Sequence, residues 1–289
     1  MKIYSLGSLN IDYVYSVDHF VRAGETLSSE NMAIFPGGKG LNQSVAVSRA
    51  GAEVIHGGCV GSGGDFLIDI MNESGVNTEK IKTVTTSSGH AIIQVDKTGQ
   101  NCILLFSGAN YQIDRSYIEG FLKDAQKGDI LLMQNEISGL SDAFEIAKQL
   151  GMKIAFNPSP YHNDIKKLPL RFVDLWFCNE IEAGELFGGD TAEETIQNFI
   201  SQYPESALVL TLGSKGSMYK DKYQQISQSA YKVKAIDTTA AGDTFTGYFL
   251  WAVSNNRDIK FALDIASRAS SIAVSREGAS KSIPFASEL

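Results

Sequence analysis

The segment 237–245, DTTAAGDTF, combines a helix start made of small residues with a carboxylate one step further along. A helical pattern continues to about residue 254, and its first amides are left uncovered by Ala240, Ala241 and Gly242. Uncovered N–H groups at the positive end of a helix dipole bind phosphate and other anions. Asp243 would lie beside such an anion, where a carboxylate can take the proton of an attacking alcohol. The segment predicts phosphoryl transfer, with a plain helix N-cap at Asp237 or Thr239 as the alternative.

A glycine-rich segment, 35–43 (FPGGKGLNQ), precedes a second helical pattern at 42–50. Its glycines permit a tight turn and a close approach of the backbone to a ligand. It is not a Walker A loop, because Lys39 is followed by Gly40 rather than by Ser or Thr. Lys39 and Asn42 suit the hydroxyl groups of a sugar, to which both can donate hydrogen bonds. The alternative is a strand-to-helix turn in which Lys39 is solvated.

Polar side chains also follow the apolar runs of the sequence. Asn10 and Asp12 lie two residues apart after the first run, so in an extended segment they share one face and suit a polyol. An Asx turn that closes the strand is the alternative. Later apolar runs end at or are followed by Gln134, Asn135, Glu136, Asn179, Glu180, Glu182 and the segment 211–216 (TLGSKG). Acidic and amide groups at strand ends suit metal–phosphate and ligand contacts.

Short apolar runs alternate with amphipathic segments through the second half of the chain. The runs occupy 129–134, 152–157, 173–178 and 207–212, and helical patterns lie around 114–127, 140–150, 180–187 and 191–203. This alternation predicts a parallel sheet covered on both faces, with ligands at the carboxyl ends of its strands. Segments 12–36 and 89–106 break the rhythm. The second predicts a hairpin, either in a small separate sheet or at the edge of the main sheet.

Composition excludes several classes of partner. The 289 residues carry a net charge of −8 without a basic run, so a nucleic acid partner is not expected. No apolar stretch reaches membrane-spanning length and no secretion signal is seen, which predicts a cytoplasmic protein. Cys59, Cys102 and Cys178 are far apart in apolar runs, which favours buried free thiols over a disulfide or zinc site. The four histidines show no metal-binding spacing.

The sequence resembles the ribokinase group of PfkB-type carbohydrate kinases over essentially its whole length. The segments that carry the resemblance occur in the family's order: GSLNID, GGKGLNQ, SGAN, LLMQNE, NPSP, NEIEAGEL, TLGSKG, DTTAAGDTF and REGASKSIP. The resemblance implies a three-layer αβα sandwich with a mainly parallel central sheet, formed by 1–11, 37–88 and 107–289. It also implies a small β-sheet lid, formed by 12–36 and 89–106, through which two copies would pair as a homodimer.

The resemblance further implies a role for each motif. Asp243 would be the catalytic base, and the amides of Ala240, Ala241 and Gly242 would hold the transferring phosphoryl group. The sugar would be bound by Asn10, Asp12, Gly38, Lys39, Asn42 and Glu136. ATP would lie against Asn179, Glu182, Thr211, Gly213, Ser214, Lys215, Gly216 and Gly242, with Glu182 completing an Asn-x-x-Glu pattern associated with Mg²⁺ and phosphate. A K⁺ ion would use the side chain of Asp237, the carbonyls of Thr239, Ala273, Arg276 and Gly278, and Ser282.

Departures from the family pattern bear on the substrate. Leu41 replaces the usual Ala beside the sugar-binding Asn, and Tyr248 stands where a small residue is usual. D-ribose, phosphorylated at its primary hydroxyl, is the first expected acceptor. Fructose, a keto-deoxy sugar acid or a nucleoside are the alternatives. A sugar- or nucleotide-binding regulator without catalysis is disfavoured, because Asp243 and Gly242 are both present.

Overall fold

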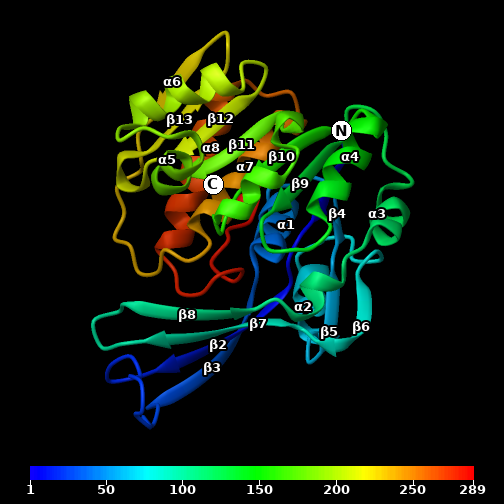
Figure 1. The fold of residues 1–289 in the computed structure, drawn as a ribbon. Helices are drawn as coiled ribbons and strands as arrows, with labels where there is room; N and C mark the ends of the chain where they lie inside the picture. Colours follow the sequence, from blue (N-terminus) through cyan, green and yellow to red (C-terminus); the bar gives the residue numbers. More distant parts are fainter.

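The computed structural model describes residues 1–289, and an eight-stranded sheet forms its centre (Figure 1). The strand order is β14 (Gln225–Gln228), β13 (Ser217–Lys220), β12 (Ala207–Thr211), β11 (Leu175–Asn179), β10 (Lys153–Asn157), β9 (Ile130–Gln134), β1 (Ile3–Leu6) and β4 (Val54–Gly57). The strands from β4 to β12 are parallel, and β13 and β14 are antiparallel at one edge. The expected mainly parallel sheet is confirmed.

Helices cover both faces of this sheet and make three layers. One face packs against α1 (Lys39–Arg49), α2 (Asp65–Glu73), α7 (Ala241–Ser254) and α8 (Ile259–Val274). The other packs against α3 (Arg115–Leu122), α4 (Leu140–Leu150), α5 (Glu180–Phe187) and α6 (Ala192–Gln202). Successive side chains of a strand point to opposite faces, so Leu131 belongs to one buried cluster and Leu132 to the other. A strand buried on both faces must be apolar throughout, which explains the continuous runs in the sequence.

A second sheet projects from this body, beside the carboxyl ends of the main strands (Figure 1). It contains, in order, β3 (Asn31–Gly37), β2 (Asn10–Ser16), β7 (Gly89–Val95) and β8 (Asn101–Phe106). We call it the small sheet. The predicted hairpin at 89–106 is β7 and β8, and it lies in the small sheet rather than at the edge of the main sheet. A two-stranded sheet, β5 (Cys59–Ser62) and β6 (Lys82–Ser87), lies nearby, and short 3₁₀ helices occur at η1 (Gly108–Gln112), η2 (Asn163–Lys167), η3 (Leu170–Phe172), η4 (Gly213–Lys215) and η5 (Ala286–Glu288).

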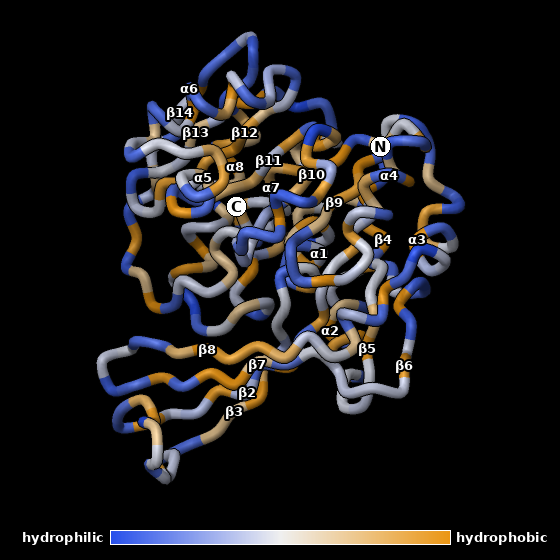
Figure 2. The backbone as a smooth tube through the Cα atoms, viewed as in Figure 1, coloured by the Kyte–Doolittle hydropathy of each residue, from blue (hydrophilic) through white to orange (hydrophobic).

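The strands of the small sheet are rich in apolar residues (Figure 2). Strand register aligns Ile34, Tyr13, Ile92 and Leu104 in a row on the face turned away from the body. Leu104 is 67% exposed there. The opposite face, turned toward the body, has a row made of Ala33, Val14, Ile93 and Ile103.

The cysteine prediction is correct at two positions and wrong at the third. Cys59 and Cys178 are buried free thiols in the body. Cys102 is exposed, because it lies on the edge strand β8 of a sheet that has no helical layer over its outer face. None of the helices is both long enough and apolar enough to cross a bilayer.

Candidate active site

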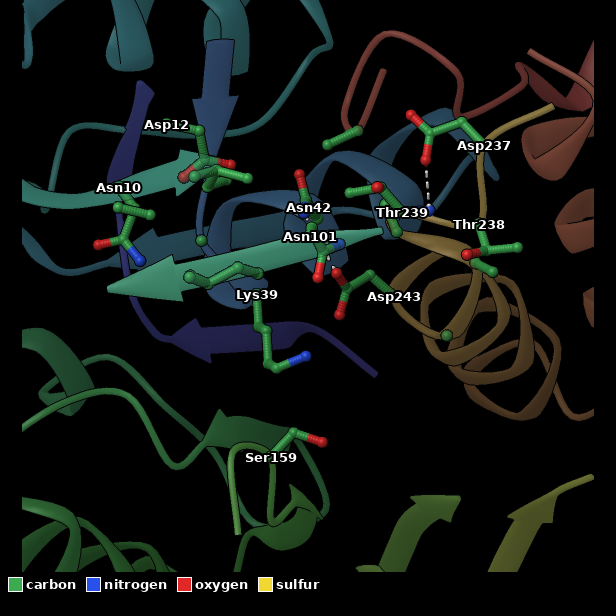
Figure 3. A pocket seen from close by; sticks show the side chains of 18 of the residues that line it. Asn10, Asp12, Lys39, Asn42, Asn101, Ser159, Asp237, Thr238, Thr239 and Asp243 are labelled. Atoms are coloured by element: carbon green, nitrogen blue, oxygen red, sulfur yellow. Dashed lines mark hydrogen bonds between the residues drawn. The ribbon is translucent and has the colours of Figure 1, made fainter. Parts of the chain in front are cut away.

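A cleft of about 1110 Å³ separates the small sheet from the carboxyl ends of β9 to β12. Every residue predicted to hold the sugar lines it: Asn10, Asp12, Gly38, Lys39, Asn42 and Glu136. The start of α7 lines it too, through Ala240, Ala241, Gly242 and Asp243. Figure 3 shows Asn10 and Asp12 from the small sheet, Lys39 and Asn42 from α1, and Asp243 from α7 around this cleft. The topology thus brings the sugar set and the predicted anion site to one place.

Close backbone packing places the start of α1 in this cleft. The helix follows Gly38, whose φ of 93° suits glycine and ends β3 in a sharp turn. A Cβ at Gly40 would lie 2.4 Å from the backbone nitrogen of Ser8, so only glycine lets α1 approach the end of β1. Asn10 and Asp12 lie in β2 on one face of the strand, and the Asx-turn alternative is wrong.

The start of α7 has no side-chain cap. Its N-cap is Ala240, which has the left-handed φ of 59° and no capping hydrogen bond, so the N-cap alternative at Asp237 or Thr239 is wrong. The left-handed region costs a non-glycine residue roughly 1–2 kcal/mol. No atom lies within 4 Å of a Cβ built at Gly242, so the space beside these amides is open. An uncapped helix start that opens into a cleft is suited to bind an anion.

Asp243 is only 7% exposed, and both of its carboxylate oxygens accept amide hydrogen bonds. Asn42 Nδ2 donates to Oδ2 over 3.1 Å (Figure 3), and Gln43 Nε2 donates to Oδ1 over 2.9 Å. Both donors come from the first turns of α1. The carboxylate is therefore held in one orientation beside the open helix start.

Lys39 lies among carboxylates and is not a solvated turn residue. Burial disfavours its ammonium group, but the negative charges of Asp243, Glu136 and Glu182 outweigh that cost and raise the pKa of Lys39. The side chain is therefore a fixed positive charge in the cleft.

Asp12 and Glu136 form the acidic part of the predicted sugar site. Burial, with a smaller contribution from the negative charge of Glu136, raises the pKa of Asp12 to about 7. Glu136 accepts from the backbone N–H of Lys39 over 3.0 Å and from the hydroxyl of Ser8. Its carboxylate is thereby tied to the turn that begins α1.

The Asn-x-x-Glu pattern forms a capping box at the start of α5. The side chain of Asn179 accepts from the backbone N–H of Glu182 over 2.8 Å, and Glu182 Oε2 accepts from the backbone N–H of Asn179 over 3.1 Å. The other oxygen of Glu182 accepts from the hydroxyl of Ser159. Asn179, Glu182 and Thr211 line the cleft, whereas Gly213, Ser214, Lys215 and Gly216 lie in the turn after β12, outside its lining.

The predicted K⁺ residues come from two segments that lie together. Backbone N–H groups of Thr239 and Gly278 donate to the Asp237 carboxylate over 2.8 and 3.0 Å. Burial opposes the charge of Asp237, but these hydrogen bonds outweigh it and lower its pKa. Asp237, Thr239 and Gly278 line the cleft, whereas Ala273, Arg276 and Ser282 do not. The hydroxyl of Ser282 donates to the carbonyl of Ala279 over 2.8 Å.

Several residues that contact the site were missed by reasoning from the sequence. They are Ser8, Gln43, Asn157 and Ser159. Each lies inside or beside a motif already noted. The feature of the sequence that could have identified them is a polar residue next to an apolar run. That signal does not say which polar atom meets which, because the partners come from distant parts of the chain.

Comparisons with known proteins agree on one family. The sequence pattern described as pfkB family carbohydrate kinase matches residues 1–286. A ribokinase from Haemophilus influenzae is 37% identical over 98% of this chain and 95% of its own length. The crystal structure of a ribokinase from Thermotoga maritima matches with a TM-score of 0.86 and 35% identity, covering 99% of this chain and 97% of the other. A Cryptococcus neoformans ribokinase in complex with ADP matches with a TM-score of 0.87 and 30% identity, covering 99% and 98%.

Proposed function

The chain belongs to the pfkB family of carbohydrate kinases, and we propose that it transfers the γ-phosphoryl group of ATP to the primary hydroxyl of D-ribose. The observation that carries the proposal is the position of Asp243, oriented by two amides beside an uncapped helix start that opens into the cleft. The similarity to proteins named ribokinase supports ribose as the acceptor. The similarity to a ribokinase that binds ADP supports ATP as the donor.

In the proposed reaction Asp243 takes the proton of the sugar hydroxyl. The hydroxyl oxygen forms a bond to the γ-phosphorus, and the bond from that phosphorus to the bridging oxygen breaks, leaving its electron pair on ADP. The amides of Ala240, Ala241 and Gly242 stabilise the charge on the transferring group, since they are pre-oriented donors at a helix start. Lys39 adds a permanent positive charge within the same cleft.

The sugar is proposed to lie between the small sheet and α1. Asn10, Asp12 and Glu136 offer acceptors for its hydroxyl groups, and Lys39 and Asn42 complete the set. Asn42 Oδ1 is buried without a partner, so it is free to accept from a sugar hydroxyl while its Nδ2 holds Asp243. The small sheet would act as a lid, because the row of Val14, Ile93 and Ile103 faces the cleft.

The nucleotide is proposed to lie along the ends of β11 and β12. Asn179, Glu182 and Thr211 line that part of the cleft, and the turn 213–216 would border the nucleotide from outside the lining. Mg²⁺, when bound with ATP, supplies charge neutralisation of the phosphates. Glu182 fits a place near such an ion, because its carboxylate is fixed by the capping box and lines the cleft.

A monovalent cation is proposed to bind where segment 237–239 meets the C-terminal loop. Asp237 is ionised there, and its two backbone donors tie together the segments that would supply carbonyl oxygens. K⁺ held by Asp237 and the carbonyls of Thr239, Ala273, Arg276 and Gly278 would fix the backbone that leads into Ala240. Ser282 is expected to contribute only indirectly, because its hydroxyl donates to Ala279.

We also propose a homodimer formed through the small sheet. Its outer face exposes Ile34, Ile92, Leu104 and Phe106, and a contiguous apolar surface of this kind marks a protein interface. Analytical ultracentrifugation of the wild type and of Leu104→Asp tests this. A dimer that becomes a monomer in the variant supports the proposal, and a wild-type monomer refutes it.

The acceptor is tested by measuring ADP release with ATP, Mg²⁺ and K⁺ against pentoses, hexoses, a keto-deoxy sugar acid and nucleosides. We expect the largest kcat/KM with D-ribose. A larger kcat/KM with another acceptor would overturn ribose and keep the kinase. No transfer to any acceptor by folded protein would overturn the kinase proposal.

A further inference from the structure

Gln43, the residue after Asn42, makes contacts beyond its hydrogen bond to Asp243 that the proposed mechanism does not use. Gln43 is 1% exposed, and its side chain lies between α1 and α7, where it contacts a residue 200 positions away. With Asn42, it supplies an amide N–H to each oxygen of the Asp243 carboxylate. A buried glutamine costs free energy unless its polar atoms are satisfied, so its contacts are a firm constraint on the site.

Two neighbours determine which way the Gln43 amide points. Gln134, the last residue of β9, donates its Nε2 to Gln43 Oε1 over 2.7 Å. Asn157, the last residue of β10, offers its Oδ1 to Gln43 Nε2 at 3.4 Å. Because its oxygen is already taken by a donor, the NH₂ group of Gln43 must face Asp243.

The orientation of Asn157 is fixed in turn by the main sheet. Its Nδ2 donates to the backbone carbonyl of Phe177 in β11 over 2.7 Å, which leaves Oδ1 for Gln43. The polar chain therefore begins at a backbone group of a buried strand, which cannot rotate. It passes through the amides of Asn157 and Gln43, each of which has hydrogen-bond partners on both its oxygen and its nitrogen.

We propose that Gln43 is a positioning residue that keeps Asp243 ready to accept the substrate proton, and that Gln134 and Asn157 set the orientation of Gln43. The inference rests on the proposed role of Asp243 as the base. An N–H donor on Oδ1 limits the rotation of the carboxylate. Proton transfer in phosphoryl transfer depends on such placement, and small displacements of a reacting group have large effects on rate.

The first test is Gln43→Glu, which keeps the length and shape of the side chain. It replaces the N–H donor by an oxygen and brings a second carboxylate to within hydrogen-bond distance of Asp243. Two adjacent carboxylates share one proton, so one of them ionises only at higher pH. We expect the acidic limb of the kcat–pH profile to move to higher pH by about one unit or more, with kcat at pH 7 lowered about tenfold. The KM for ATP should stay within about twofold of the wild-type value.

The second test removes the hydrogen bonds without adding a charge. Gln43→Met should lower kcat by about tenfold, and Gln134→Met should lower it less, because Asn157 still guides Gln43. In the double variant the two effects on kcat should not add, since Gln134 acts only through Gln43. Fully additive effects would show that Gln134 does not act through Gln43.

Ser44→Ala is the matched control. Ser44 is the next residue of α1, is buried, and hydrogen-bonds His56 rather than Asp243. It should lower the unfolding midpoint and leave the pH profile unmoved. If Gln43→Glu and Gln43→Met, both folded, keep wild-type kcat and pH profile, the inference is overturned. Asp243→Asn, measured in parallel, distinguishes this result from failure of the proposed base. If Asp243 is not the base, Asp243→Asn will remain fully active; if it is the base, Asp243→Asn will be impaired whatever the Gln43 variants do.

Discussion

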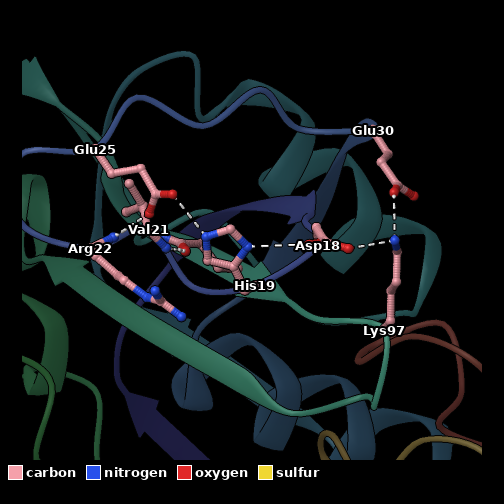
Figure 4. A network of polar contacts seen from close by, with 8 residues as sticks. Asp18, His19, Val21, Arg22, Glu25, Glu30 and Lys97 are labelled. Carbon is pink, nitrogen blue, oxygen red and sulfur yellow. Dashed lines mark hydrogen bonds and ion pairs between the residues drawn. The ribbon is translucent and has the colours of Figure 1, made fainter.

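Two polar clusters of this molecule use similar groups in opposite surroundings. The amide cluster (Asn42, Gln43, Gln134 and Asn157 around Asp243) is buried at the carboxyl edge of the main sheet. The tip cluster lies at the far end of the small sheet and consists of Asp18, His19, Glu25, Glu30 and Lys97 (Figure 4). Figure 4 shows its ion pairs joining the loop after β2 to the turn between β7 and β8.

The difference in burial between the two clusters indicates where the loss of a polar contact should affect stability or activity. In the tip cluster Lys97 is paired with Asp18 at 2.5 Å and with Glu30 at 3.6 Å, yet all three side chains are largely exposed to water. Hydrogen bonds from the ring of His19 to the carboxylates of Glu25 and then Asp18 raise the pKa of His19, but water and salt screen such pairs. The residues of the amide cluster are buried, so a lost partner leaves a buried polar group unsatisfied and each contact constrains its neighbours. Short distances alone do not indicate which cluster matters for function.

The largest expected effect separates two aspartates, one from each cluster. Asp243→Asn should lower kcat by a factor on the order of 10²–10⁴ with sugar binding nearly intact, as expected for loss of a general base. Asp18→Asn, the same change in the tip cluster, should leave kcat at the wild-type value. Steady-state kinetics with the best acceptor measures both. An active Asp243→Asn variant, or an Asp18→Asn variant that is equally impaired, would contradict the claim that only the buried cluster is needed for activity.

Asp237 is intermediate between the buried Asp243 and the exposed Asp18, because it is partly exposed yet accepts two backbone hydrogen bonds. Asp237→Ala should raise the K⁺ concentration for half-maximal activity by about tenfold, a loss of roughly 1.4 kcal/mol in binding. The KM for ATP should change less. Asp264→Ala is the control, since that carboxylate accepts from the exposed Tyr231 hydroxyl. An unchanged response to K⁺ in Asp237→Ala would remove Asp237 from the cation site.

The titration of Asp12 should make both sugar binding and stability depend on pH. Its pKa is raised to about 7, so the carboxylate is neutral below that pH and loses acceptor strength toward sugar hydroxyls. The KM for the sugar should rise as pH falls from 8 to 6, by at most about tenfold per unit. Stability changes in the opposite sense, because the folded state holds the proton more tightly than the unfolded chain. This contribution to stability is fully present below the ordinary pKa near 4 and is lost as pH rises through 7.

Asp12→Asn is the control for both effects. It cannot titrate, so its KM and its unfolding midpoint should lose the pH dependence that arises near 7. A variant that keeps the wild-type dependence of KM on pH would assign that dependence to another group.

The smallest effect is expected from Lys97→Ala in the tip cluster. The side chain is exposed, so the unfolding midpoint should not change measurably, and raising the salt concentration should affect the wild type and the variant alike. Thermal unfolding at low and high salt checks this. A clear loss of stability that disappears at high salt would show that exposed ion pairs contribute here after all.

The sequence predicted the elements better than the contacts between them. Continuous apolar runs marked the parallel strands, because a strand buried on both faces admits little else. The glycine turn and the DTTAAGDTF segment marked the cleft, because their chemistry is local. The amide cluster was not predictable, since Gln43 and Asp243 are 200 positions apart and their meeting depends on the packing of α1 against α7. Cys102 was misjudged because an apolar neighbourhood in the sequence does not reveal whether a sheet has a covering layer.

Sheet order has a consequence for how this protein is made. Strand β1 pairs with β4 and also with β9, so the first strand to be synthesised waits for residues 130–134 before its second edge is covered. The small sheet needs nothing beyond Phe106, and its strands can pair while the second half of the chain is still being synthesised. Long-range pairing of this kind forms late. The amides and the carboxylate that meet at α7 come together only when synthesis is nearly over, so an unfinished chain lacks the proposed site of phosphoryl transfer, whatever part of it has already folded.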